Sequence, residues 1–137
     1  MSDFPVALVT GGSQRIGAEI CRQLHAYSYR LVVHCRRHNE AAQALCDELN
    51  SQRPDSAIVG YADFETPGAA ETLADQALAS WGRLDALVNN ASGFYPTPLG
   101  EVTEADWDSL MGSNVKGAFF LSQALYPALK KQRGAIV

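Results

Sequence analysis

The chain has 137 residues, of which 47% are hydrophobic and 19% are charged, so it fits one globular domain and excludes a disordered, collagenous or coiled-coil chain. Its 11 Lys and Arg against 15 Asp and Glu give a net charge of -4, which argues against nucleic acid as the main partner. It has no apolar run near the roughly 18 residues of a membrane span, and Met1 to Phe4 do not resemble a secretory signal, so we expect a cytoplasmic protein without a membrane partner.

Short apolar segments rich in strand-forming residues alternate with longer segments of helical spacing. The predicted strands are Val6–Val9, Leu31–Val33, Ala57–Val59, Leu84–Val88 and Ala135–Val137. The predicted helices run from about Arg15 to Tyr27, from Asn39 to Asn50, from Gly68 to Ser80, and from an N-cap at Thr103 to about Lys131. This alternation predicts an α/β fold with a doubly wound parallel sheet, Rossmann-like, whose fifth strand is cut by the end of the chain.

Two predicted helices carry regular apolar stripes. In the first, Ile16, Ile20 and Leu24 recur at intervals of four, which predicts one stripe packed against the sheet. In the last, Asn114 falls within a stripe formed by Trp107, Leu110, Ala118, Leu121, Leu125 and Leu129. A buried amide needs hydrogen-bond partners, so Asn114 is interpreted either as a residue that steadies packing or as a functional one.

The segment from Thr10 to Gly17 reads T-G-G-S-Q-R-I-G and joins the first strand directly to the first helix. Glycines allow a sharp turn and a close approach of phosphate, and the helix start supplies free N–H donors. The G-x-G-x-x-G pattern is absent, and Arg15 replaces the middle glycine of the related T-G-x-x-x-G-x-G form. The segment predicts a dinucleotide-binding turn, with a purely structural strand-to-helix turn as the alternative.

Basic residues follow the second strand, where an NAD-binding fold would place an acid. The chain reads H-C-R-R-H over residues 34–38, and no acid occurs between Glu19 and Glu40. A locally positive surface would receive an adenosine 2′-phosphate, which favours NADPH over NADH. The alternative is a solvated basic turn.

The cysteines and histidines do not form a recognisable metal site. Cys21, Cys35 and Cys46 form no C-x-x-C pair, which predicts reduced thiols. His34 and His38 flank a strand end and would not share a helical face. We therefore predict no bound metal.

The N-N-A-S segment at residues 89–92, directly after the fourth strand, resembles the N-N-A-G motif of the short-chain dehydrogenase/reductase family. Thr10-Gly11 with Gly17, Ala62-Asp63 after the third strand, and Asn114 in the last helix match the family in order. The resemblance covers essentially the whole chain.

Within the family, Arg15, His34, Arg37 and the run from Asn90 to Leu99 resemble the pteridine reductases. The stretch over residues 44–58 looks like that subgroup as well. Cys35 departs from it, because pteridine reductases often carry an aromatic residue at this position, and Arg36 and His38 also vary.

The resemblance implies roles for residues at the strand ends. Those expected to bind the cofactor, NADPH, are Gly11, Arg15, Ile16, Gly17, His34, Arg36, Arg37, Ala62, Asp63, Asn90, Ala91 and Ser92. Arg15, Ser92 and Phe94 would contact a pterin-type substrate, with Phe94 stacked on the pterin opposite the nicotinamide; the alternative is that Phe94 and Tyr95 merely anchor the loop. Asn114 is the catalytic position present, and its backbone would hold a water of the proton relay.

The implied function is NADPH-dependent reduction of pterins, dihydropterins or dihydrofolate. The family's Tyr-x-x-x-Lys proton donor lies beyond the fifth strand, whereas Tyr126 to Lys130 has this spacing before the strand and is interpreted as structural. We therefore expect residues 1–137 to be the NADPH-binding portion of a single reductase domain, inactive alone. The family also implies a homo-oligomer, commonly a tetramer. The alternatives are a short-chain reductase of another carbonyl substrate and a non-catalytic NADPH-binding protein.

Overall fold

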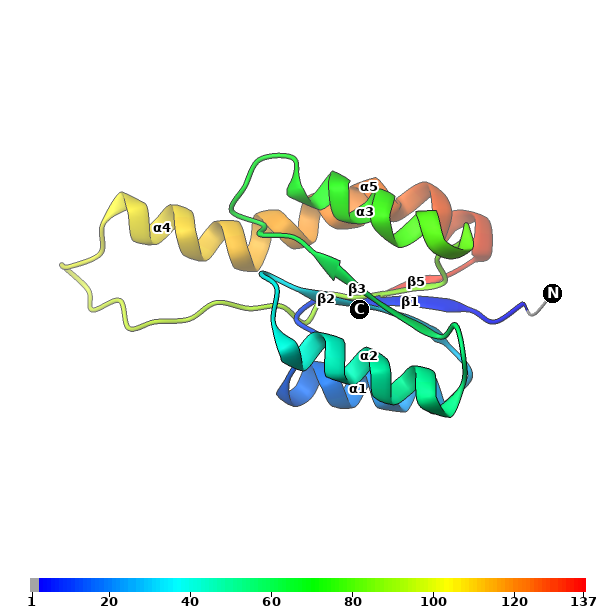
Figure 1. The fold of residues 1–137 in the computed structure, drawn as a ribbon. Coiled ribbons are helices and arrows are strands. Elements are labelled where there is room, and N and C mark those ends of the chain that lie inside the picture. Colours follow the sequence, from blue (N-terminus) through cyan, green and yellow to red (C-terminus); the bar gives the residue numbers. More distant parts are fainter. Residues whose placement is uncertain (1–2) are drawn as a thin grey trace.

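The computed structural model describes residues 3–137 as a parallel sheet with helices on both faces (Figure 1). Met1 and Ser2, the first residues of the N-terminal segment that does not resemble a secretory signal, lie outside the described residues. The strands are β1 (Val6–Val9), β2 (Arg30–Cys35), β3 (Ala57–Tyr61), β4 (Ala86–Val88) and β5 (Ala135–Ile136). The helices are α1 (Arg15–Ala26), α2 (Glu40–Gln52), α3 (Ala69–Trp81), α4 (Glu104–Met111), the π-helical segment η1 (Gly112–Lys116) and α5 (Gly117–Gln132).

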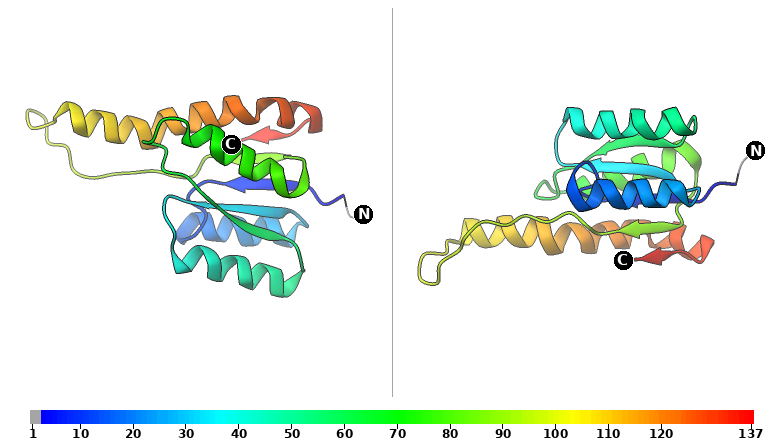
Figure 2. Two further views of the ribbon diagram at one scale, coloured as in Figure 1. Left: turned by 45° about the horizontal axis from the view of Figure 1, so that its top comes forward. Right: turned by 90° about the horizontal axis from the view of Figure 1, so that it is seen from below.

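The strand order is β3-β2-β1-β4-β5, and every neighbouring pair is parallel. Helices α1 and α2 cover one face and α3 and α5 the other, as two further views confirm (Figure 2). The predicted doubly wound sheet is therefore confirmed. Most element bounds lie within two residues of the predicted ones; β2 is longer and includes His34 and Cys35.

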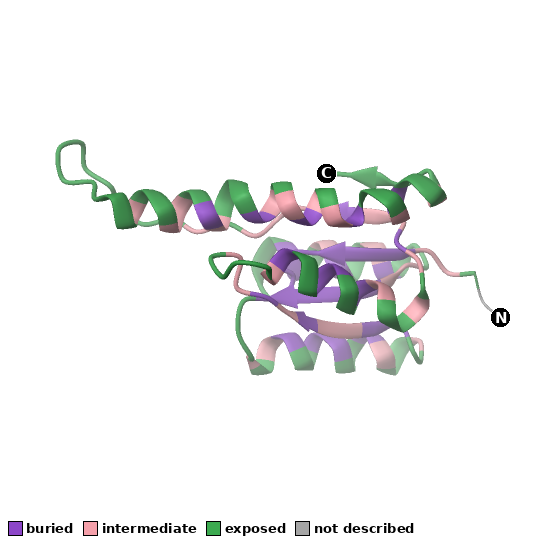
Figure 3. Cartoon of the chain, turned by 90° about the horizontal axis from the view of Figure 1, so that it is seen from above, coloured by how far each residue is buried: buried purple, intermediate pink, exposed green. Residues whose placement is uncertain are grey.

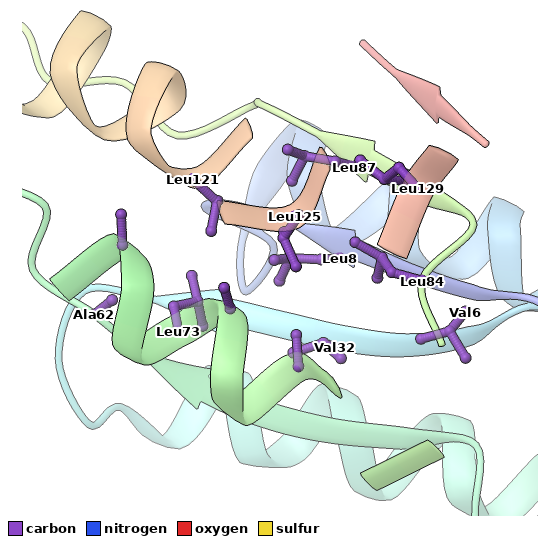
Figure 4. Close-up of a cluster of buried hydrophobic side chains, with 13 residues drawn as sticks. Val6, Leu8, Val32, Ala62, Leu73, Leu84, Leu87, Leu121, Leu125 and Leu129 are labelled. Carbon is purple, nitrogen blue, oxygen red and sulfur yellow. The ribbon is translucent and has the colours of Figure 1, made fainter. Parts of the chain in front are cut away.

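Alternating side chains of the strands build two hydrophobic layers. Val6 and Leu8 of β1 point to the face covered by α3 and α5, whereas Ala7 and Val9 point to the face covered by α1 and α2. Figure 4 shows the first layer, in which Leu73 of α3 and Leu121 and Leu125 of α5 meet the strand residues. Burial on both faces explains why the strand sequences are continuously apolar.

The predicted stripe of α1 is only partly correct. Ile16 is 72% exposed, and the buried residues of the helix are Gly17, Ala18, Cys21 and His25. Ile20 and Leu24 are half-buried beside them. The small residues Gly17 and Ala18 let the helix start approach the sheet closely, which turns Ile16 outward.

The predicted last helix is interrupted, and its stripe is buried only in part. Thr103 is the N-cap of α4, as predicted, and forms a capping box with Asp106. The π-helical η1 then separates α4 from α5. Leu121, Leu125 and Leu129 are buried, but Trp107 is 62% exposed because α4 projects beyond the sheet (Figure 3). Asn114 is exposed, so the prediction that it lies buried in an apolar stripe is wrong.

Tyr126 and Lys130 lie in the C-terminal half of α5, which runs back toward the start of β5. The Lys130 ammonium sits 5.9 Å from the centre of the Tyr126 ring. Cys21, Cys35 and Cys46 are buried and unpaired, and burial raises the pKa of Cys21 and Cys46 to about 12. Across residues 3–137, no helix has the length and apolarity needed to cross a membrane.

Candidate functional site

The side chain of Thr10 joins the carboxyl ends of β1 and β4. Its hydroxyl accepts the backbone N–H groups of Asn90 and Ala91, each at 2.9 Å, and donates to the Val88 carbonyl at 3.3 Å. Thr10 is only 2% exposed, so these bonds form largely out of bulk water. The glycine-rich turn and the N-N-A-S segment are therefore held together as one unit.

Gly17 and Gly11 let the turn after β1 lie directly against Asn90. A Cβ atom at Gly17 would lie 2.1 Å from the Gly11 carbonyl oxygen and 2.7 Å from Asn90 Nδ2, so no side chain fits. The Asn90 amide donates to the carbonyl oxygens of Thr10 and Gly11, both at 3.1 Å. Gln14, the N-cap of α1, makes no side-chain cap bond, so the helix start keeps N–H donors for a ligand.

Arg15 occupies the first position of α1 with a φ of 52°, in the left-handed region. Glycine adopts this conformation freely, whereas other residues are strained there by about 1–2 kcal/mol. The turn thus keeps the backbone of the glycine that the T-G-x-x-x-G-x-G form has at this position. Arg15 is exposed, which leaves its guanidinium available to a ligand lying over the turn.

His34 is built into the framework beneath the site. Its Nδ1 accepts the Gly11 N–H at 2.9 Å, so the ring proton is on Nε2, which donates to the Ala62 carbonyl at 2.8 Å. The side chain is 2% exposed and stacks at a tilt on Phe64, with ring centroids 4.8 Å apart. Burial lowers the pKa of His34, although the bond to Ala62 opposes this shift. The ring is therefore neutral and ties β2 to both the turn and the end of β3.

The basic cluster after β2 is less positive than the local sequence indicates. Arg36 Nε lies 3.1 Å from Asp63 Oδ2, and Arg36 Nη2 lies 2.7 Å from Glu65 Oε2. Burial opposes ionisation of Asp63, but the Glu65 backbone N–H and the Arg36 guanidinium outweigh it and lower the pKa of that carboxyl. Arg37 is exposed and forms no ion pair with any part of residues 3–137.

Gly11 lines two clefts at the carboxyl edge of the sheet. One, of about 370 Å³, lies between the turn after β1 and the basic cluster, where Arg36 and Arg37 line it with Ser13 and Gln14. The other, of about 350 Å³, brings together predicted site residues from four strand ends: Gly11, His34, Arg36, Ala62, Asp63, Ala91, Ser92 and Phe94. Together they provide an elongated site that passes over the glycine-rich turn.

Asn114 reaches this site from η1. Its Oδ1 accepts the Gly93 N–H at 3.0 Å, and its Nδ2 donates at 2.8 Å to the carbonyl oxygens of Gly93 and Leu110. A hypothetical Cβ at Gly93 would lie 2.8 Å from Ser113 Oγ, so the loop also packs closely on the helix. The side chain of Asn114 therefore fixes the residue that precedes Phe94, itself 87% exposed. Helical segments of π type are frequent at functional sites.

Most residues that line this site were predicted from the sequence, but Glu65 and the role of the Thr10 hydroxyl were not. A signal for Glu65 was present, because β2 and β3 are parallel neighbours and Cys35 pairs with Tyr61. The residues that follow these two strands therefore meet, and the acids after β3 face the arginines after β2.

The fold and the site together define a short-chain dehydrogenase: the model of that family matches residues 5–137, and the chain belongs to it. The chain is 38% identical over 151 residues to pteridine reductase 1 of Leishmania tarentolae, covering 88% of this chain and 52% of that protein. It is 33% identical over 132 residues to 3-oxoacyl-(acyl-carrier-protein) reductase FabG of Staphylococcus aureus, covering 96% of this chain and 53% of that one.

Among solved structures, a short-chain dehydrogenase/reductase double mutant from Serratia marcescens superposes with a TM-score of 0.85 at 27% identity. The match covers 91% of this chain and 51% of that chain. The chain thus spans about half the length of the relatives that it matches. The resemblance to the family and to its pteridine reductases, predicted from the motifs, is confirmed at the level of sequence similarity.

The residues present fit a dinucleotide. Gly11 and Gly17 let the turn pack directly against Asn90 and Ala91, the helix start offers N–H donors, and Gly11 lines both clefts. The short-chain dehydrogenases use nicotinamide cofactors, which have this elongated shape.

Proposed function

We propose that residues 1–137 form the NADPH-binding portion of a short-chain reductase domain that reduces a pterin-type substrate. The observation that carries the proposal is the Thr10 junction, which fixes the glycine-rich turn and the N-N-A-S segment side by side between the two clefts. This arrangement gives one cofactor a phosphate site and a reaction site on a single rigid framework.

In this proposal the bound cofactor extends through both clefts. Its pyrophosphate lies over the turn from Gly11 to Gly17, with Arg15 and Ile16 beside it. Arg36, Arg37 and Asp63 surround the adenosine. His34 supports the cofactor site from beneath, through its bonds to Gly11 and Ala62. The other cofactor-binding residues are Ala62, Asn90, Ala91 and Ser92. NADPH supplies the hydride when it is bound.

Phe94 is proposed to orient the substrate. It is 87% exposed at the rim of the 350 Å³ cleft and is held on a loop that Asn114 fixes at Gly93. An exposed aromatic ring on an anchored backbone offers a flat surface for a heteroaromatic substrate at little conformational cost. Arg15 and Ser92 complete the proposed contacts, and Asn114 is the catalytic position whose backbone would hold a relay water.

A second candidate is the reduction of another carbonyl substrate. The similarity to 3-oxoacyl-(acyl-carrier-protein) reductase extends over 96% of the chain, more than the 88% shared with pteridine reductase 1. The open, exposed loop around Phe94 would also admit a longer substrate than a pterin. A non-catalytic NADPH-binding role is the remaining alternative.

Cofactor binding is tested by calorimetry with NADPH and NADH on the natural protein that contains residues 1–137. We expect tighter binding of NADPH, and a loss of about tenfold in NADPH affinity for Arg37→Gln with little change for NADH. Lys131→Gln, which removes an exposed charge from the last turn of α5, is the matched control. Equal or tighter binding of NADH to the unchanged protein contradicts the cofactor assignment.

The substrate is tested with the same protein by following NADPH oxidation with biopterin-type substrates, dihydrofolate and a 3-oxoacyl thioester. We expect the unchanged protein to turn over the pterins and Phe94→Leu to have a raised KM for them. Leu99→Ala, at another exposed position between β4 and α4, is the control and should keep the KM of the unchanged protein. Turnover of the thioester alone favours the second candidate. The isolated 137-residue chain is proposed to bind NADPH without turnover.

We also propose a homo-oligomer, a tetramer by family resemblance. Trp107, Met111, Val115 and Phe119 form an exposed apolar stripe along α4, η1 and α5, which supports this assembly. Light scattering on the unchanged protein and on Trp107→Glu tests it, with a smaller assembly expected for the variant. Three buried, unpaired cysteines support a cytoplasmic, reducing location.

A further inference from the structure

The guanidinium of Arg36 is held by two carboxylates from the segment after β3. Asp63 binds its Nε at 3.1 Å and Glu65 binds its Nη2 at 2.7 Å, while the Arg36 side chain remains 54% exposed. All three residues line the same 350 Å³ cleft. Two of the three guanidinium nitrogens of Arg36, Nε and Nη2, therefore already have acidic partners.

The two carboxylates offset part of the positive charge expected to attract a 2′-phosphate. Arg36 and Arg37 contribute two positive charges, and Asp63 and Glu65 contribute two negative ones at the same edge of the sheet. Coulomb interactions between groups in contact at a partly exposed site remain appreciable. A negative ligand beside Arg36 therefore meets a less positive surface than the local sequence indicates.

Glu65 differs from Asp63 in what its carboxylate does. Asp63 Oδ1 also accepts the Glu65 backbone N–H at 3.1 Å, which shapes the turn after β3. The Glu65 carboxylate, in contrast, has Arg36 as its hydrogen-bond and ion-pair partner. Glu65 also packs beside η1, because its Cγ would lie 3.4 Å from a Cβ at Gly112. The Glu65 side chain is thus held by its ion pair with Arg36 and by its packing beside η1.

We propose that Glu65 is a specificity-determining residue that competes with the adenosine 2′-phosphate for Arg36 and thereby limits the preference for NADPH over NADH. The inference rests on the proposed function, which places the adenosine beside Arg36. For the phosphate to bind the Nη2 edge of Arg36, that nitrogen must exchange the Glu65 carboxylate for a phosphate oxygen. The 2′-hydroxyl of NADH requires no such exchange, so Glu65 weakens NADPH binding selectively.

The test measures dissociation constants for NADPH and NADH by calorimetry on the natural protein that contains this chain, unchanged and as Glu65→Gln. We expect the ratio of the NADH constant to the NADPH constant to rise about three- to tenfold in Glu65→Gln, as for removal of one nearby charge. Glu65→Asp keeps the charge and should leave the ratio within about twofold. Glu71→Gln, which removes an exposed charge from the first turn of α3, should leave the ratio unchanged.

Arg36→Gln completes a double-mutant cycle, since a residue that acts through Arg36 should lose its effect when Arg36 is absent. A ratio that is unchanged or lower in Glu65→Gln overturns the inference about Glu65. The inference is also overturned if Glu65→Gln raises the ratio of the two dissociation constants as much in the Arg36→Gln variant as in the unchanged protein. Binding of neither cofactor to the unchanged protein, or tighter binding of NADH, overturns the proposed function itself, which is a distinguishable result.

Discussion

Replacing Thr10 with valine tests whether one buried hydroxyl joins the two halves of the site. Valine preserves the shape of threonine, so the change removes hydrogen-bonding capacity without creating a cavity. The N–H groups of Asn90 and Ala91 would both lose this acceptor at 2.9 Å, and only Asn90 would keep another, the Val88 carbonyl at 3.1 Å. A donor left unsatisfied in a buried place costs about 1–3 kcal/mol.

The expected loss follows from these two donors. Both belong to half-buried residues, where water can replace part of a lost bond, and the Asn90 N–H keeps the Val88 carbonyl. We therefore expect the free energy of unfolding to fall by about 2–3 kcal/mol. This is a large part of the roughly 5–15 kcal/mol that stabilises a typical domain. Urea unfolding followed by circular dichroism should show a lower midpoint with an unchanged slope.

Two variants separate the hydroxyl from other effects. Thr10→Ser keeps the acceptor and should lose only about 1 kcal/mol with its methyl group. Thr72→Val removes an exposed hydroxyl that donates to the Gly68 carbonyl and should change stability by no more than about 0.5 kcal/mol. If Thr10→Val were as stable as Thr10→Ser, the reasoning about the junction would be refuted.

Three further predictions concern the same framework. Gly17→Ala should lower the free energy of unfolding, measured with urea, by about 1–3 kcal/mol, because the new methyl group would lie 2.1 Å from the Gly11 oxygen. A stability equal to that of the wild type would contradict this close approach. Burial lowers the pKa of His34 below its usual 6.5, so the unfolded chain takes up more protons as the pH falls through that range, and the free energy of unfolding should decrease on acidification. In His34→Asn the free energy of unfolding should depend less steeply on pH. An unaltered pH dependence would exclude His34 as the cause. Asn114→Ala should speed hydrogen exchange of the Gly93 amide by about tenfold, which mass spectrometry can follow, whereas an unchanged rate would show that the bond does not hold the loop.

The fold could be predicted because its signals are local. The apolar runs and the periodic segments between them determine a parallel sheet covered on both faces, and Thr103 marks the start of α4 by its capping chemistry alone. The turn was also predictable, since the structure leaves no room for a side chain at Gly17 and gives Gly11 a positive φ of 60°.

The remaining features depend on contacts between distant segments. The charge at the basic cluster was misjudged because Arg36 is paired with Asp63 and Glu65, which follow the neighbouring strand. Periodicity placed Ile16 against the sheet, but the smaller residues Gly17 and Ala18 pack there and Ile16 points outward. Periodicity likewise placed Asn114 in a buried stripe, although this part of the helix lies beyond the sheet and carries a π-helical segment.

The π-helical segment η1 separates the sequence constraints on α4 from those on α5. A π-type turn accommodates more residues than an α-helical turn, so it shifts the angular phase between α4 and α5. The projecting end of the helix is thereby uncoupled from the buried end, where Leu121 and Leu125 must keep their register with the sheet. Substitutions in α4 can consequently reshape the mouth of the site while the packed layer beneath it stays in place.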